Sequence, residues 1–163
     1  MRDPSTAAGD ALRGSGAAPR VLVTEAPFDL AAEAARMQGT GDVGALASFT
    51  GICRADDGLR AMVLEHYPGM TERALRGIAE QAMGRWPLSA CTVIHRFGRM
   101  EPGDGIVLVL TASAHRAAAL ESCAFLMDWL KTKAPFWKRE ELADGSGRWV
   151  EARAADEDAA GRW

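Results

Sequence analysis

Residues 105–133, GIVLVLTASAHRAAALESCAFLMDWLKTK, contain the two segments that decide the fold. The nearly continuous apolar run at 106–111 is typical of a central strand that is covered on both faces. The residues after it predict a long helix over 114–133, with Ser113 as its N-cap and Pro135 just beyond its end. A central strand that leads directly into a long helix predicts a domain in which helices cover a sheet.

The rest of the chain supplies more strands and helices on both sides of this pair. Periodicity predicts, in order, a strand at 21–24, a helix at 28–37, strands at 43–50 and 59–67, a helix at 70–86 and strands at 91–97, 136–142 and 148–151. Turn residues at 54–58 favour an antiparallel hairpin between the strands on either side of them. The order of elements predicts one α+β domain over 21–153, with a mixed, largely antiparallel sheet.

Length and charge exclude several classes of protein. The chain has 163 residues, close to the roughly 150 of one ordinary domain. Its 19 Lys and Arg against 22 Asp and Glu give a net charge of −3, which does not favour a broad nucleic-acid-binding face. No apolar run is long enough to span a membrane. We therefore expect neither nucleic acid nor a membrane as a partner.

The two ends of the chain differ in composition from the middle. Residues 1–20 mix charge with Ala, Gly, Ser and Pro and lack the apolar stretch of a signal peptide, which predicts a disordered tail. Residues 154–163 are polar and acidic and predict a loosely held C-terminal tail. The three cysteines form no C-x-x-C, so neither a disulfide framework nor a structural metal site is expected. These features favour a cytoplasmic protein.

Lysine is the most informative residue type in this chain. There are three lysines against sixteen arginines, and all three lysines, Lys131, Lys133 and Lys138, lie within eight positions. Unlike arginine, lysine has an amine that can act as a base or nucleophile when its pKa falls. Equally, three solvated lysines can simply stabilise the C-terminus of a helix.

The position of Lys131 on its helix favours a chemical role. It follows Met127 by four residues, Ala124 by seven and Leu120 by eleven, which predicts that it lies on the apolar stripe. An amine that is partly desolvated there should have a lowered pKa.

The position of Lys138 points the same way. It stands in APFWKR at 134–139, where aromatic neighbours can wall a pocket. With Lys133 and Arg139 nearby, the segment predicts a cationic site for a phosphate or a carboxylate.

Other candidates are weaker when each is taken alone. His115 and Arg116 open the long helix, where a cationic pair suits a phosphate, although an ordinary polar cap fits as well. Arg54 follows a glycine turn at the end of a strand. We expect His66 and His95 to be structural. We expect the cysteines to be small buried residues rather than nucleophiles. Only Cys53, beside Arg54, has a setting that favours a thiolate.

Five short motifs occur in an order that, taken together, is specific. They are FTG at 49–51 with Arg54, LEHYPGM at 64–70, VIHR at 93–96, SAHR at 113–116 and LKTKAPFWKRE at 130–140. From about residue 43 to 153 the chain resembles the large, catalytic subunit of molybdopterin synthase, the MoaE family. The resemblance implies an α/β-hammerhead-like fold with added strands.

The resemblance also implies a reaction and its partners. The family is a sulfurtransferase that converts cyclic pyranopterin monophosphate to molybdopterin, within molybdenum cofactor biosynthesis. The sulfur comes from the C-terminal Gly-Gly thiocarboxylate of a small ubiquitin-like subunit, whose tail enters a pocket of the large subunit. The assembly is a heterotetramer around a homodimer of large subunits. No metal and no bound cofactor is implied.

By position, the resemblance makes Lys131 and Lys138 the catalytic pair. It implies substrate and phosphate contacts from six further residues: Arg54, His115, Arg116, Arg139, Glu140 and Arg153. It implies that Phe49 and Met127 wall the pocket. Two alternatives remain: a sulfurtransferase that carries a persulfide on Cys53, and a non-catalytic module that binds a ubiquitin-like tail or a pterin phosphate.

The implied substrate contacts raise a geometric difficulty. The fifteen steps from Arg116 to Lys131 span roughly 22 Å along one helix, too far for one pterin phosphate. A two-fold dimer with antiparallel helices would bring His115 and Arg116 of one protomer to Lys131 of the other. The sequence therefore predicts a shared site.

Overall fold

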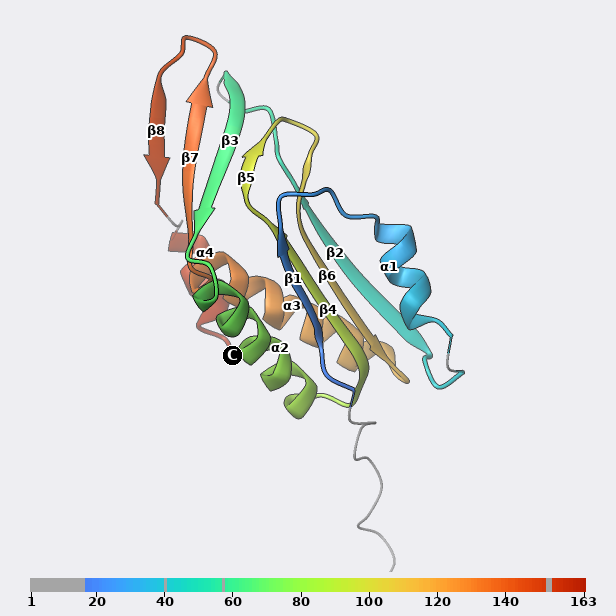
Figure 1. Ribbon diagram of the computed structural model, residues 1–163. Helices are drawn as coiled ribbons and strands as arrows, with labels where there is room; N and C mark the ends of the chain where they lie inside the picture. The colour runs from blue at the N-terminus through green and yellow to red at the C-terminus, as the bar shows by residue number, and fades with distance from the viewer. Residues whose placement is uncertain (1–16, 40, 57, 152–153) are drawn as a thin grey trace, which may run out of the picture.

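The computed structural model describes residues 17–39, 41–56, 58–151 and 154–163. These residues form two four-stranded sheets and four helices (Figure 1). None of the helices in these ranges combines the length and the apolar character that crossing a membrane requires. The α+β class and the largely antiparallel pairing expected from the sequence are confirmed.

The first sheet contains the predicted central strand. Its strand order is β1-β4-β6-β2, with bounds Arg20–Thr24 (β1), Leu88–Arg96 (β4), Gly105–Ser113 (β6) and Ala45–Ile52 (β2). Only β1 and β4 run parallel; the other pairs are antiparallel. Strand β6 is paired on both edges and its middle residues are fully buried, as its apolar run predicts.

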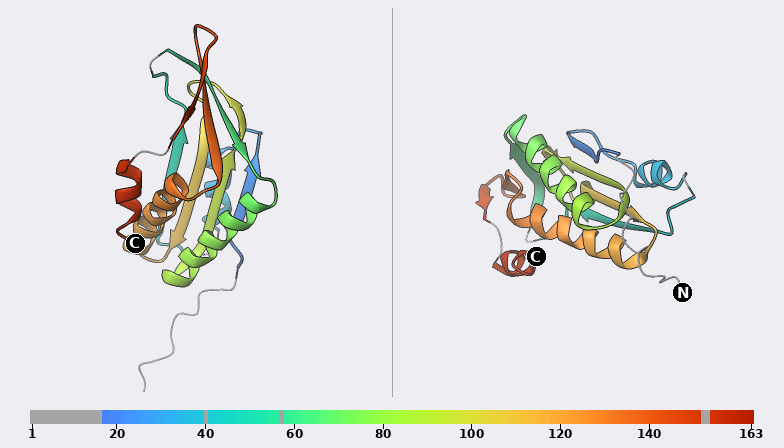
Figure 2. Two further views of the ribbon diagram at one scale, coloured as in Figure 1. Left: turned by 90° about the vertical axis from the view of Figure 1, so that its left-hand side faces the viewer. Right: turned by 90° about the horizontal axis from the view of Figure 1, so that it is seen from below.

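Helices cover both faces of this sheet. On one face, α2 (Met70–Arg85) and α3 (Arg116–Thr132) contribute to the larger core, which includes Leu75, Val109 and Leu126. The other face packs around Met37, at the end of α1 (Leu30–Met37). Seen from below, α1 and α3 lie on opposite sides of the sheet (Figure 2).

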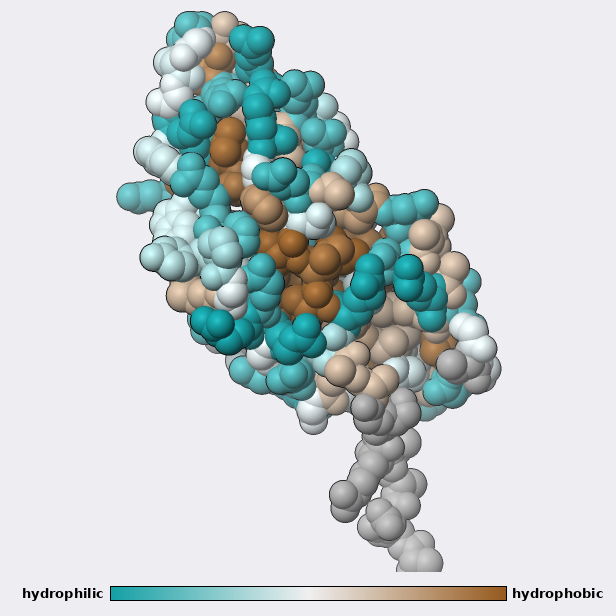
Figure 3. Space-filling model, in the orientation of Figure 1, coloured by the Kyte–Doolittle hydropathy of each residue, from teal (hydrophilic) through white to brown (hydrophobic). Residues whose placement is uncertain are grey.

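The second sheet extends beyond one end of the first. Its order is β5-β3-β7-β8, with bounds Gly98–Met100 (β5), Leu59–His66 (β3), Phe136–Leu142 (β7) and Gly147–Val150 (β8). A third core, which includes Cys53, Met62 and Leu64, lies where the sheets meet. The projecting sheet is covered mainly by hydrophilic side chains, whereas apolar ones gather in the middle of the same face, over β1 (Figure 3).

The expected hairpin between 43–50 and 59–67 is wrong. Strand β2 pairs with β6, and β3 pairs with β5 and β7 in the other sheet. The Cys53 amide donates to the Asp104 carbonyl, and the Gly103 amide donates to the Cys53 carbonyl, both at 2.8 Å. The chain after β2 therefore stays beside the turn before β6, because pairing with the buried β6 outweighs a local turn.

The long helix begins two residues later than expected. Its N-cap is His115, and Ser113 remains the last residue of β6. The Ser113 hydroxyl donates to the Pro87 carbonyl at 2.8 Å and accepts from the His115 amide at 3.4 Å, one residue before the helix begins.

The expectation for the C-terminal ten residues is also wrong. They include helix α4 (Ala154–Ala160), which lies against α3. Both Arg162 and the Trp163 indole donate to the Asp128 carboxylate, at 2.8 Å and 2.6 Å. The indole also packs edge-on against Trp86 and Phe125. Residues 1–16 of the expected N-terminal tail lie outside the described residues.

Candidate functional site

The two candidate lysines approach the same end of the central strand. Lys131 lies in the last turn of α3 and Lys138 is the third residue of β7. The charge of Lys131 acts on His95, which pairs with Val107 in β6. The charge of Lys138 acts on Cys53, whose amide bonds the Asp104 carbonyl just before β6. The site thus lies where α3, β4, β6 and β7 meet.

Lys131 is exposed rather than partly buried. The apolar stripe expected on its helix does not exist as such, because Leu120 is 62% exposed while Met127 is buried. The four residues of the expected stripe lie along the border between the buried and exposed faces of α3; they are Leu120, Ala124, Met127 and Lys131. Within the described residues Lys131 takes part in no ion pair. Its amine is therefore available to a ligand.

Lys138 has a carboxylate partner. Its Nζ lies 3.3 Å from Oε1 of Glu140, and Arg148 Nε donates to the other oxygen of Glu140 at 2.7 Å. Burial alone would raise the pKa of Glu140, but these two hydrogen bonds and charges outweigh it and lower the pKa. Glu140 is therefore ionised at neutral pH and holds the Lys138 amine on the inner face of the sheet.

Aromatic rings line the inner side of the lysine site. The Phe136 ring stacks on His95 with centroids 3.8 Å apart and an interplanar angle of 18°. On its other side Phe136 approaches His66, which packs against Phe97 with centroids 4.4 Å apart. These four rings, here called the aromatic column, come from β3, from the end of β4 and the residue after it, and from the start of β7. They connect the two sheets beneath the lysines.

His95 and His66 have different hydrogen bonding within the column. Burial lowers the pKa of His95 to about 4; the Arg96 carbonyl opposes this, and the charges of Lys131 and His66 add to it. His66 Nδ1 is buried and has no hydrogen-bond partner among the described residues. The sequence suggested only a structural role for both histidines and gave no sign that they meet.

Cys53 does not have the reactive setting expected from Arg54 beside it. It is buried, and burial raises the pKa of its thiol, although the charge of Lys138 opposes that change. Burial also raises the pKa of Cys123 to about 11 and that of Cys91 to about 12. All three thiols are therefore protonated at neutral pH, which disfavours a persulfide carrier.

Three further candidates lie near this end of the sheet. Arg54 is exposed just beyond β2 and its Nε donates to Asp56 at 2.6 Å. Phe49 pairs with Val109 and so lies on the face that α3 covers, yet it is 39% exposed. Met127 is buried in the core on the same face. These positions suit a cationic rim and an apolar wall.

His115 and Arg116 lie far from the lysines of their own chain. They are exposed at the first end of the continuous helix α3, and Lys131 is in its last turn. The N-cap His115 makes no side-chain capping bond, and the first turn holds no acidic residue. This helix end therefore keeps free amide groups and positive charge for an anion.

The candidate Arg139 is not brought into the site. Arg139 neighbours Lys138 in β7 and therefore points to the opposite face of the sheet. There it lies 3.5 Å from Glu141 and pairs in register with Trp149 of β8. Arg153 lies outside the described residues.

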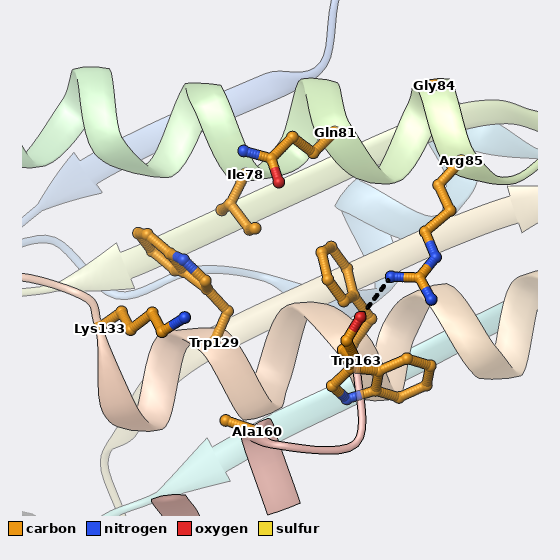
Figure 4. Close-up of a pocket in the computed structure, with 9 residues that line it drawn as sticks. Ile78, Gln81, Gly84, Arg85, Trp129, Lys133, Ala160 and Trp163 are labelled. Carbon is orange, nitrogen blue, oxygen red and sulfur yellow. Dashed lines mark hydrogen bonds between the residues drawn. The ribbon is translucent and has the colours of Figure 1, made fainter.

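The third lysine, Lys133, lies at a pocket elsewhere in the molecule. Lys133 lines a pocket of about 570 Å³ between α2, α3 and the C-terminal segment, together with Trp129 and Trp163 (Figure 4). Arg85 on the opposite wall donates to the Trp163 carbonyl at 3.2 Å. The three neighbouring cations of the sequence, Lys133, Lys138 and Arg139, thus point to three different places. Within the described ranges no group of His, Cys, Asp and Glu residues could hold a metal ion.

Known proteins resemble this chain over most of its length. The family model "MoaE protein" matches residues 23–133. The molybdopterin synthase catalytic subunit of Mesorhizobium japonicum is 56% identical over 149 residues, which cover 90% of this chain and 94% of that protein. A solved structure, the molybdopterin biosynthesis MoaE protein from Burkholderia ambifaria, is 48% identical with a TM-score of 0.76, covering 89% and 97% of the two chains. A complex of subunits 1 and 2 of the molybdopterin-converting factor from Helicobacter pylori is 18% identical with a TM-score of 0.67, over 85% and 92%, which shows a shared fold.

Proposed function

Because the chain belongs to the MoaE protein family, we propose that it is the catalytic subunit of a molybdopterin synthase. It is an enzyme of molybdenum cofactor biosynthesis and a sulfurtransferase. The observation that carries the assignment of its site is the convergence of Lys131 and Lys138 at one end of β6.

The proposed substrate is cyclic pyranopterin monophosphate, and the proposed sulfur donor is a small ubiquitin-like subunit with a C-terminal Gly-Gly thiocarboxylate. In each transfer a C–S bond forms to the pterin, the C–S bond of the thiocarboxylate breaks, and water supplies the oxygen of the carboxylate left on the donor tail. One dithiolene therefore consumes two loaded tails. Both reactants are anions. A site with two amines and a nearby arginine is suited to hold them together.

The two lysines are proposed to have different tasks because their surroundings differ. Lys131 is exposed and unpaired within the described residues, so its ammonium can bind the thiocarboxylate and exchange a proton with it. Lys138 is held by Glu140 and acts at the substrate, where it offsets the charge that develops as the cyclic phosphate opens. Arg54 is proposed as a phosphate contact at the rim.

His115 and Arg116 are proposed to act in the site of a second copy of the chain. They can reach a substrate held by Lys131 only if they come from another protomer, because α3 separates them from their own Lys131. We therefore propose a homodimer with shared sites, inside a heterotetramer with two small subunits. Arg139, Glu140 and Arg153 stay as proposed substrate contacts. Because Arg139 points to the face of the sheet opposite Lys138, it can contact only a substrate that lies on that face. The three free thiols support a cytoplasmic location.

A single-turnover assay tests the function. The purified chain is mixed with thiocarboxylated small subunit and cyclic pyranopterin monophosphate, and dithiolene product is measured. Product formation is expected, and binding of both reactants without product would mean a non-catalytic module. In the same assay Cys53→Ala should retain the wild-type rate; its loss would favour a persulfide on Cys53.

A further inference from the structure

His95 is a buried polar residue to which the proposed function gives no task. Its side chain is 7% exposed, and its Nδ1 lies 2.8 Å from the main-chain carbonyl oxygen of Arg96. In a neutral imidazole that nitrogen must carry the hydrogen to make this bond. The ring is therefore fixed in one orientation at the end of β4.

The aromatic ring nearest to His95 is that of Phe136. The two rings are stacked, and Phe136 packs against both the core beneath α3 and the core between the sheets. Phe136 is also the first residue of β7, five positions after Lys131 and two before Lys138. Its placement therefore determines how the end of α3 is joined to the strand that carries Lys138.

Burial and the charges around His95 favour a neutral group at this position. Burial has the largest effect on the pKa of His95, and the charges of Lys131 on α3 and His66 on β3 lower it further. The neighbouring Arg96 guanidinium is directed to the carbonyl oxygens of Glu25 and Gly105. A carboxylate at position 95 would pair with Lys131, and a cation would repel it. An uncharged ring does neither.

We propose that His95 is a positioning residue of the sulfur-transfer reaction: its uncharged ring holds Phe136, and through Phe136 it sets the relative placement of Lys131 and Lys138. The inference rests on the proposed function only in taking these two amines as the reacting pair. It concerns a residue that touches neither reactant.

The lysine content of the chain allows a direct test that needs no substrate. Labelling lysine with ¹³C at Cε gives three signals, one for each lysine. In His95→Asn, which keeps a donor for the Arg96 carbonyl but removes the ring, the Lys131 and Lys138 signals should shift. The Lys133 signal should shift less, because that side chain lies at the separate pocket between α2 and α3.

Activity provides the second readout, with a matched variant. The single-turnover rate of His95→Asn should fall by about tenfold or more, because small misplacements of reacting groups are costly. The substrate concentration that gives half of the maximal single-turnover rate should change little. His95→Phe keeps a ring on Phe136 and should recover most of that loss. If His95→Asn does not fold, Phe136→Leu removes the same stack and is measured in the same way.

The outcomes separate the two proposals. Unchanged Lys131 and Lys138 signals in a folded variant, or an unchanged rate, overturn the role of His95. Equal losses in His95→Asn and His95→Phe also overturn it, because the ring would then not be what matters. A wild-type protein without product overturns the proposed function, while the lysine spectra still decide whether His95 positions the amines.

Discussion

Replacement of Lys131 should cost more activity than any other single change in the site. Of the two amines in the proposed site, Lys131→Ala removes the one that is exposed and takes part in no ion pair among the described residues, and we expect a loss of about 10²-fold to 10⁴-fold in the single-turnover rate. Lys131→Arg should also fail, because a guanidinium keeps its charge but does not release a proton. Folding and affinity for the small subunit serve as controls. Near-normal turnover by Lys131→Arg would exclude proton transfer and leave only charge.

Acid should weaken the fold through His95. The pKa of His95 in the folded state is about 4, against an ordinary value of 6.5. Between these two pH values His95 binds a proton in the unfolded chain but stays neutral in the folded chain. Stability should therefore fall as pH drops from 6.5 towards 4, by up to about 3 kcal/mol from this residue. Urea unfolding at pH 7 and pH 4.5 measures this loss. His95→Phe should lose less over the same interval; an identical loss would show that other groups are responsible.

At the residue scale, composition singled out three lysines but not their surroundings. Scarce lysine pointed to Lys131, Lys133 and Lys138 together, and the burial expected for Lys131 was wrong because its stripe follows the border of α3. Strand alternation in β7 already implied that Arg139 faces away from Lys138. The contact between His95 and Phe136 joins two strands of different sheets, and no local pattern in the sequence encodes it.

At the element scale, the C-terminal segment stabilises the helical layer. Trp163→Ala removes an indole that packs against Trp86 and Phe125 and donates to Asp128. We expect a loss of about 1–2 kcal/mol of stability and faster amide exchange in α4, without a change in sulfur transfer. Trp149→Ala, at a 58% exposed position on β8, is the matched control. Equal effects of the two changes would mean that the Trp163 contacts add nothing.

Most elements, but not all of their pairings, were predictable. Helix α2 and strands β6 and β7 lie close to where periodicity placed them, because their apolar patterns are strong. The failed hairpin after β2 shows why pairing is harder to predict: turn residues act locally, whereas the β6 residues that pair with β2 lie 53 to 68 positions further along the chain. The C-terminal helix was missed because its acidic sequence has little apolar periodicity, and Arg162 and Trp163 hold it through Asp128.

At the scale of the whole assembly, the small subunit should be held mainly by its tail. A flexible tail that ends in a carboxylate can enter a site with amines at its end and bind in an extended conformation. Deleting the last two residues of the small subunit should abolish sulfur transfer and remove much of the affinity. Binding can be measured by calorimetry with the wild-type chain. A truncated subunit that binds as tightly as the intact one would place the main contacts elsewhere.

The proposed shared site requires residues from two protomers, so it can be tested by mixing two inactive variants. Helix α3 runs unbroken from Arg116 to Thr132, so no bend brings Arg116 to the Lys131 of the same chain. Arg116→Ala and Lys131→Ala proteins should each be inactive alone. When they are mixed and their subunits exchange, a mixed dimer has one site with both defects and one site with neither, so each mixed dimer should have about half the activity of a wild-type dimer. In an evenly exchanged mixture about half of the dimers are mixed, so the sample should return to about a quarter of wild-type activity. Exchange can be followed by mass spectrometry with one isotopically labelled variant. Proven exchange without recovered activity would place each site within a single chain, and His115 and Arg116 would then need a task other than holding the substrate of Lys131.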